Sequence, residues 1–204
     1  MQAKQTSSEA QHGTTRKNKL ILLLVIAACA APLIFSYVTY YLIKPETRTN
    51  YGALLDPRAY PIPQLALQTI DGQPANLNQF KGKWIFLQVD SANCDKACKE
   101  KLFFMRQIRL TQGKEMDRIE RVWLITDKAP LETVLMREYD GTHLLRAQSA
   151  ELRAWLPAEA DTKIEDHLYM IDPLGNLMMR FPKAGDPNKI KKDILKLLKA
   201  SRIG

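Results

Sequence analysis

Cys94 and Cys98 are the residues of this chain best suited to chemistry. They follow the apolar run at residues 84–89, which predicts a buried strand, and they open a helical pattern. On a helix, a spacing of four places both side chains on one face, about one turn apart, so two sulfurs could hold one metal ion or close a disulfide. A helix N-terminus also favours the thiolate, the form that binds metals and attacks disulfides. The pair is therefore both a candidate metal site and a candidate redox dithiol.

The neighbours of the two cysteines predict their environment. A free cysteine is usually a small buried hydrophobic residue. Here, charged side chains surround the pair: Asp95, Lys96, Lys99 and Glu100. These neighbours predict that the two thiols face water.

Residues 20–43 predict one transmembrane helix, because this run carries no charge and is long enough to cross a bilayer. Arg16, Lys17 and Lys19 precede it closely, and basic residues favour the cytoplasmic side. The chain is thus expected to be a single-pass protein of the inner (cytoplasmic) membrane. Its N-terminus would be cytoplasmic and its C-terminal domain periplasmic.

Cys29 raises an alternative to this anchor. The sequence Ile26-Ala27-Ala28-Cys29 is similar to a lipoprotein processing box, and cleavage there would leave a lipid on Cys29. The apolar run continues well past Cys29, farther than a signal peptide needs, which favours an uncleaved helix. Either outcome tethers the rest of the chain to a membrane.

Composition divides the chain into four parts. Residues 1–19 are polar and predict a disordered cytoplasmic tail, and the proline-rich residues 44–63 predict an extended linker. Residues 64–204 are enough for one domain with its own core. The net charge of +8 favours anionic lipid or an acidic protein as partner. The chain has no nucleic-acid-binding motif, so no nucleic acid is expected.

The periodicity within residues 64–204 predicts an α/β domain. Strands are expected at residues 64–70, 84–90, 121–126, 167–171 and 177–181. Helices are expected at residues 94–111, 131–139, 150–156 and 187–201. Strand 84–90 is expected to be central, because a nearly continuous apolar run suits a strand covered on both faces. A dithiol at the first long junction between strand and helix is typical of a thioredoxin-like fold, with a central mixed sheet flanked by helices.

These residues resemble the Sco/SenC family of copper chaperones for cytochrome c oxidase assembly. That family has a membrane-anchored thioredoxin-like domain with a Cys-x-x-x-Cys pair, which Cys94 and Cys98 match, and a distant Asp-His, which His167 matches. Asp95 and Lys99 stand beside the cysteines where the family usually has proline, so the chain is a divergent match.

The resemblance implies a copper site formed by Cys94, Cys98 and His167. The ion would be copper, chiefly Cu(I) with Cu(II) as a second state, and the partner a cytochrome c oxidase subunit or another copper-site protein. Two thiolates and one imidazole suit Cu(I), whereas structural zinc usually takes four protein ligands. A three-ligand site of soft donors could also release its metal to a partner.

Each histidine also has a simpler interpretation. His167 could be a partly buried strand residue that hydrogen-bonds to Asp166 or to a backbone carbonyl. His143 follows Asp140 and Gly141, a setting that predicts a turn and a surface role.

Two other function classes remain open. A membrane-tethered thiol-disulfide oxidoreductase would use Cys94 and Cys98 as its catalytic pair, although such enzymes usually have Cys-x-x-Cys and a proline near the position of His167. The two roles are linked, because only the reduced dithiol binds Cu(I). A thioredoxin-like peroxidase would have threonine where Ser91 stands. The third class is a non-catalytic assembly factor in which the two cysteines form a structural disulfide.

Overall fold

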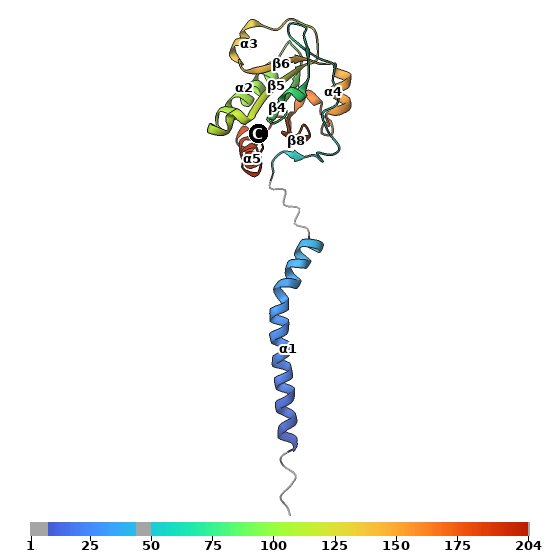
Figure 1. The fold of residues 1–204 in the computed structure, drawn as a ribbon, viewed down its shortest axis with the longest axis vertical. Coiled ribbons are helices and arrows are strands. Elements are labelled where there is room, and N and C mark those ends of the chain that lie inside the picture. Colours follow the sequence, from blue (N-terminus) through green and yellow to red (C-terminus); the bar gives the residue numbers. More distant parts are fainter. Residues whose placement is uncertain (1–7, 44–49, 204) are drawn as a thin grey trace, which may run out of the picture. The chain divides into compact units, whose positions relative to one another are not determined.

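A computed structural model describes residues 8–43 and 50–203. The chain divides into two compact units, Met1–Arg48 and Thr49–Gly204, and each is described by itself (Figure 1). The first unit consists of helix α1 (Ser8–Val38), which continues into a short π-helical turn, η1 (Thr39–Ile43).

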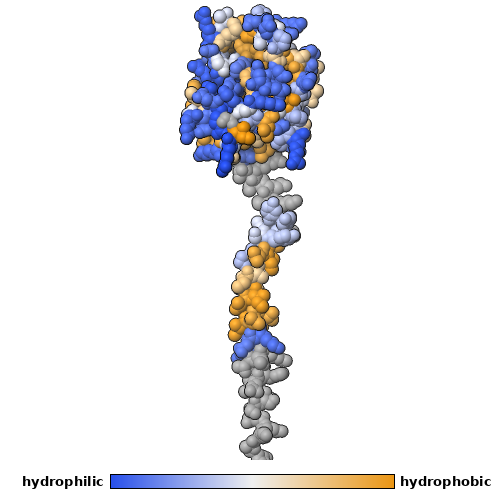
Figure 2. Space-filling view, in the orientation of Figure 1, coloured by the Kyte–Doolittle hydropathy of each residue, from blue (hydrophilic) through white to orange (hydrophobic). Residues whose placement is uncertain are grey.

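Helix α1 and the start of η1 together form one segment, Lys17–Tyr41, that is long and apolar enough to cross a membrane. Its apolar side chains are exposed, and Figure 2 shows them gathered along the helix beyond a polar end. The structure is helical from Ser8 onward, whereas the polar composition of residues 1–19 predicted disorder. Continuing an existing helix avoids the cost of nucleation, so polar residues join it readily. Residues 1–7 of the expected tail lie outside the described residues.

The second unit is built on one mixed sheet, whose strand order in the described residues is β1-β8-β7-β4-β5-β6-β2-β3. Its strands are β1 (Ala53–Leu54), β2 (Leu67–Thr69), β3 (Pro74–Ala75), β4 (Trp84–Asp90), β5 (Ile119–Ile125), β6 (Thr142–Arg146), β7 (Leu168–Ile171) and β8 (Leu177–Phe181). Strand β4 pairs in parallel with β5 and antiparallel with β7, so it is central, as its apolar run predicts.

Helices cover both faces of this sheet. They are α2 (Lys96–Leu110), α3 (Thr133–Glu138), α4 (Ser149–Trp155) and α5 (Pro187–Ala200), with short 3-10 helices η2 (Leu77–Phe80), η3 (Gly113–Arg118) and η4 (Ile164–Asp166). Helices α2 and α5 pack with β4, β7 and β8 in one buried cluster, and α4 packs with η2 and the opposite face of β4 in another. Helix α3 joins α2 and β5 in a third cluster. The predicted thioredoxin-like arrangement is confirmed.

Two segments differ from the sequence-based expectation. His143 was expected in a turn, but it lies in strand β6, paired with Val122 of β5. Residues 50–63 were expected to be linker, but Ala53 and Leu54 pair with β8, and Pro61 bridges to Asn176. The folded unit therefore begins about a dozen residues earlier than the alternating pattern indicates, because backbone pairing at a sheet edge needs no hydrophobic periodicity. Residues 44–49 of the expected linker lie outside the described residues.

Candidate dithiol site

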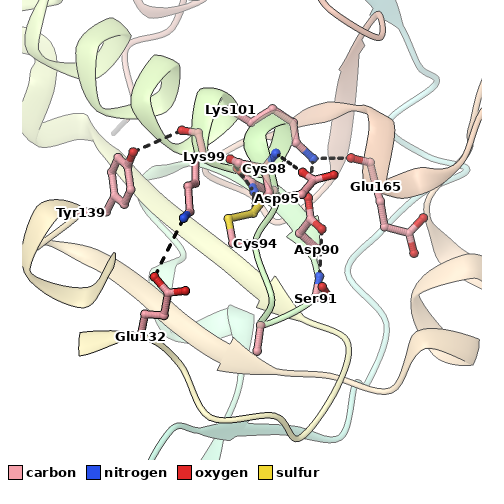
Figure 3. Close-up of a disulfide and its surroundings, with 12 residues drawn as sticks. Asp90, Ser91, Cys94, Asp95, Cys98, Lys99, Lys101, Glu132, Tyr139 and Glu165 are labelled. Carbon is pink, nitrogen blue, oxygen red and sulfur yellow. Dashed lines mark hydrogen bonds and ion pairs between the residues drawn. A yellow bond between two sulfur atoms is a disulfide. The ribbon is translucent and has the colours of Figure 1, made fainter. Parts of the chain in front are cut away.

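Cys94 and Cys98 form a disulfide, with their Cα atoms 5.1 Å apart (Figure 3). Strand β4 ends at Asp90, and a short loop carries the chain to Cys94. Asp95 then caps helix α2, since its Oδ1 accepts a hydrogen bond from the backbone N–H of Cys98 at 2.9 Å. The loop and the cap together position both sulfurs at the positive end of α2.

The sequence predicted that both cysteines lie on one face of a helix, but only Cys98 lies in a helix. Cys98 belongs to the first turn of α2, whereas Cys94 precedes the capping residue Asp95 and lies outside the helix. Asp95 explains the difference, because a capping residue has extended backbone angles, here φ −72° and ψ −173°. The disulfide therefore links a loop to a helix.

The prediction that the pair faces water is wrong. Cys94 is 4% exposed and Cys98 is completely buried. They pack in a cluster with Leu102 of α2 and Trp123 of β5, while the charged neighbours of the pair point to the surface. Cys98 lies on the face of α2 that packs on the core, whereas Lys96, Lys99 and Glu100 lie on faces of the same helix that are exposed to solvent.

Access to the disulfide is from the side of Cys94. A shallow surface groove has Cys94 in its wall, and its other walls are Asp95, Lys96, Lys99, Glu100, Phe103 and Tyr139. Cys98 does not line this groove. An incoming thiol or metal ion would therefore meet the sulfur of Cys94 first.

A charged pair lies beside the site at the end of β4. Lys101 of α2 donates to Asp90 at 2.9 Å and also to the backbone carbonyl of Glu165 (Figure 3). Burial raises the pKa of the Asp90 carboxyl, and the nearby Lys101 ammonium opposes this shift. Lys101 thus ties the first turns of α2 to the segment that precedes β7.

His167 is completely buried, and both of its ring nitrogens have partners. Its Nδ1 lies 2.9 Å from the carbonyl oxygen of Phe181, which only accepts, so Nδ1 carries the proton. Nε2 then accepts from the N–H of Glu159 at 3.4 Å and from the hydroxyl of Thr162 at 2.7 Å, whose single proton is shared with the carbonyl oxygen of Glu159, also at 2.7 Å. Burial lowers the pKa of His167, so the neutral ring is favoured.

Within the described residues, no group of three or more His, Cys, Asp or Glu side chains is placed to hold a metal ion. The disulfide occupies both sulfurs, and the lone pair of His167 Nε2 is used by Thr162. His143 lies elsewhere, 3.1 Å from Glu120 and stacked near Phe80. Its exposed position agrees with the surface role expected from the sequence.

Sequence reasoning missed one polar contact of the disulfide. Gln88 of β4 is completely buried and donates from Nε2 to the sulfur of Cys98 at 3.2 Å. Its signal in the sequence is its position, because Gln88 interrupts an otherwise apolar run. A polar residue inside a central strand needs a partner.

A family model described as a transmembrane-like, thioredoxin-like, C-terminal domain matches residues 84–201, more than half of the chain. The chain belongs to this family. The match begins at strand β4 and extends through helix α5, so it includes the disulfide and His167. A search of curated proteins finds no match.

Among solved structures, this family member is similar to Sco proteins. The copper-bound form of yeast Sco1 superimposes with a TM-score of 0.53 at 14% identity, covering 74% of this chain and 90% of that one. BsSco is named as a Sco-family cytochrome c oxidase assembly protein with a disulfide switch. It superimposes with a TM-score of 0.53 at 17% identity, covering 71% of this chain and 95% of that one. A SCO1/SenC family lipoprotein from Bacillus anthracis superimposes with a TM-score of 0.55 at 18% identity, covering 72% of this chain and 98% of that one. The resemblance to Sco proteins is thus confirmed at the level of the fold.

Proposed function

We propose that this chain is a membrane-anchored, Sco-like thiol protein whose Cys94–Cys98 pair binds Cu(I) when reduced and assists assembly of a copper site in cytochrome c oxidase. The observation that carries the proposal is the disulfide itself. It lies at the start of α2 in a fold shared with copper-bound yeast Sco1 and with the oxidase assembly protein BsSco.

The proposed location rests on helix α1. Lys17–Tyr41 would anchor the chain in the inner membrane as a single span, with the N-terminus cytoplasmic and the thioredoxin-like domain periplasmic. Copper sites of respiratory oxidases that face this compartment would be within reach of such a domain. The partner would be an oxidase subunit or another copper-site protein.

Copper would be cargo, held by the two thiolates that remain after reduction. Two sulfurs on residues whose Cα atoms are 5.1 Å apart are close enough to share one ion, and thiolates suit Cu(I). His167 would be the third ligand through Nε2. It would first have to give up the hydrogen bonds from Thr162 and Glu159, so copper binding would be coupled to movement of the segment before β7.

The test is a titration of the reduced full chain in detergent with Cu(I) against a competing chelator. A Cys29→Ser background removes the free thiol in α1. One tightly bound ion is expected, and Cys94→Ser or Cys98→Ser should abolish tight binding. His167→Ala should weaken it by at least the roughly 10- to 100-fold that loss of an outer-shell partner costs.

His143→Ala is the matched control, because it removes an imidazole that contacts Glu120 on another strand. Its copper affinity should equal that of the parent chain. Stoichiometric copper retained by the Cys94→Ser, Cys98→Ser double variant would refute the site.

A second candidate function is thiol-disulfide oxidoreductase, and two observations favour it. Cys94 borders a groove while Cys98 is buried behind it, an arrangement suited to attack on one sulfur. His167 is fully hydrogen-bonded, as a structural residue would be. No copper binding above the competitor, together with rapid disulfide exchange, would establish this function in place of the first. A disulfide that resists mild reduction would instead indicate the non-catalytic assembly factor.

A further inference from the structure

Gln88 is the single polar side chain in the apolar run of β4 from Trp84 to Val89. In the sheet it lies between Trp123 of β5 and Leu168 of β7, and its side chain is completely buried. Its neighbours on the same face of β4 belong to the layer beneath α2. The amide therefore has no access to water and depends on protein partners.

Among the described residues, the hydrogen-bond partner of the Gln88 amide is Cys98. Nε2 donates both to the backbone carbonyl of Cys98, at 3.3 Å, and to its sulfur, at 3.2 Å. A carbonyl oxygen only accepts, so the nitrogen side of the amide must face Cys98. The other side, Oε1, has no hydrogen-bond partner among the described residues. Burying this carbonyl costs stability.

The value of the contact with sulfur depends on the redox state. Reduction adds two electrons and two protons to the Cys94–Cys98 bond and yields two thiols, either of which is able to release its proton. A disulfide sulfur is a poor acceptor, whereas a thiolate accepts a charge-assisted hydrogen bond that is roughly twice as strong as a neutral one. The N–H of Gln88 therefore stabilises the reduced pair more than the oxidised pair.

We propose that Gln88 is a positioning residue that sets the redox equilibrium of the Cys94–Cys98 pair by favouring its reduced form. This inference rests on the redox cycling contained in the proposed function. It gives a physical reason for a buried glutamine in a central strand: the chain keeps an unpaired carbonyl in its core in order to direct an N–H at the sulfur.

The test uses the full chain in detergent, with the Cys29→Ser change, equilibrated with mixtures of reduced and oxidised glutathione. Two glutathione molecules supply the electrons and protons and become one glutathione disulfide. Gln88→Leu should lower the equilibrium constant for reduction by about tenfold, equivalent to about 30 mV. The same variant should be as stable to denaturant as the parent or more so, because it removes the unpaired carbonyl.

Gln112→Leu is the matched control. Gln112 is also a buried glutamine beside α2 with an unpaired Oε1, but its Nε2 donates to the carbonyl of Ile108, far along the helix from Cys98. Its equilibrium constant should stay that of the parent. Two results would overturn the role of Gln88 while leaving the redox cycling intact. One is an equilibrium constant for reduction in Gln88→Leu equal to that of the parent. The other is an equal change of that constant in Gln112→Leu. A disulfide that glutathione does not reduce in the folded protein would overturn the cycling as well.

Discussion

The two sulfurs of the disulfide differ in what surrounds them. Cys94 lines a groove and follows a loop, whereas Cys98 is held by the Asp95 cap above and the Gln88 amide below. The Gln88 amide donates to the Cys98 sulfur, and the Asp95 carboxylate accepts from the Cys98 backbone N–H, so the position of Cys98 is set before any partner arrives. This asymmetry suits a reaction that starts at Cys94 and ends at Cys98.

Burial of His167 should make the stability of the domain depend on pH. Burial holds its pKa below the ordinary value of about 6.5, whereas the unfolded chain keeps that value. Between the two pKa values, the unfolded state binds a proton that the native state does not. The free energy of unfolding should therefore decrease as the pH falls below about 6.5, until the pH passes the native pKa.

Denaturant titrations of the full chain near neutral pH and at about pH 5 would measure this slope, and His167→Gln should reduce it. Equal slopes in the parent and in His167→Gln would show that His167 is not responsible.

At the scale of elements, Asp193 connects the entry of the domain to its last helix. This carboxylate of α5 is 2% exposed and accepts from the backbone N–H groups of Tyr51 at 2.6 Å and Gly52 at 2.9 Å. Gly52 itself fits closely, since a Cβ atom there would lie 2.8 Å from Met179. The first described residues of the folded unit are therefore held against α5 and β8.

Replacing Asp193 by alanine should lower the free energy of unfolding by about 2 kcal/mol or more, because the buried N–H of Gly52 and the partly buried N–H of Tyr51 lose their carboxylate acceptor. Lys192→Ala, an exposed position on the same helix, should change it by less than about 0.5 kcal/mol. Chemical denaturation of both variants decides the point. A loss for Asp193→Ala no larger than that for Lys192→Ala would mean that the contact contributes little.

Elements also differ in how well their patterns revealed them. Helices α2 and α5 were predicted close to their observed bounds because burial of one face imposes periodicity, and strand β4 because burial of both faces leaves a continuous apolar run. Strand β6 was missed, since Gly141 and Thr142 suggest a turn and His143 is polar. Strand β1 is only two residues long, and its register comes from its partner β8. The conformation of such short or polar strands is set by pairing with neighbouring strands rather than by the propensity of their own residues.

At the scale of the whole molecule, the fold should survive reduction. The disulfide closes a loop with a sequence separation of only four, for which the chain-entropy estimate is about 2 kcal/mol. The three buried clusters of the thioredoxin-like unit draw on the sheet and on α2, α3, α4 and α5, so most of the core is independent of this bond.

Circular dichroism of the full chain, with and without a strong reductant, should give the same spectrum at room temperature and a lower thermal midpoint after reduction. The Cys94→Ser, Cys98→Ser double variant should behave like the reduced protein. Unfolding on reduction would exclude a dithiol that cycles and would favour the structural disulfide.

Local composition and periodicity were enough to predict the apolar helix, the α/β order of the domain and a Cys-x-x-x-Cys pair at the junction of β4 and α2. The folded structure was needed to show that the two sulfurs are buried, that His167 contacts Thr162 and Phe181, and that Gln88 contacts Cys98. Those facts depend on how a strand, a helix and the segments between them pack against one another. Burial and hydrogen bonding are properties of packed surfaces, and no spacing within one segment encodes them.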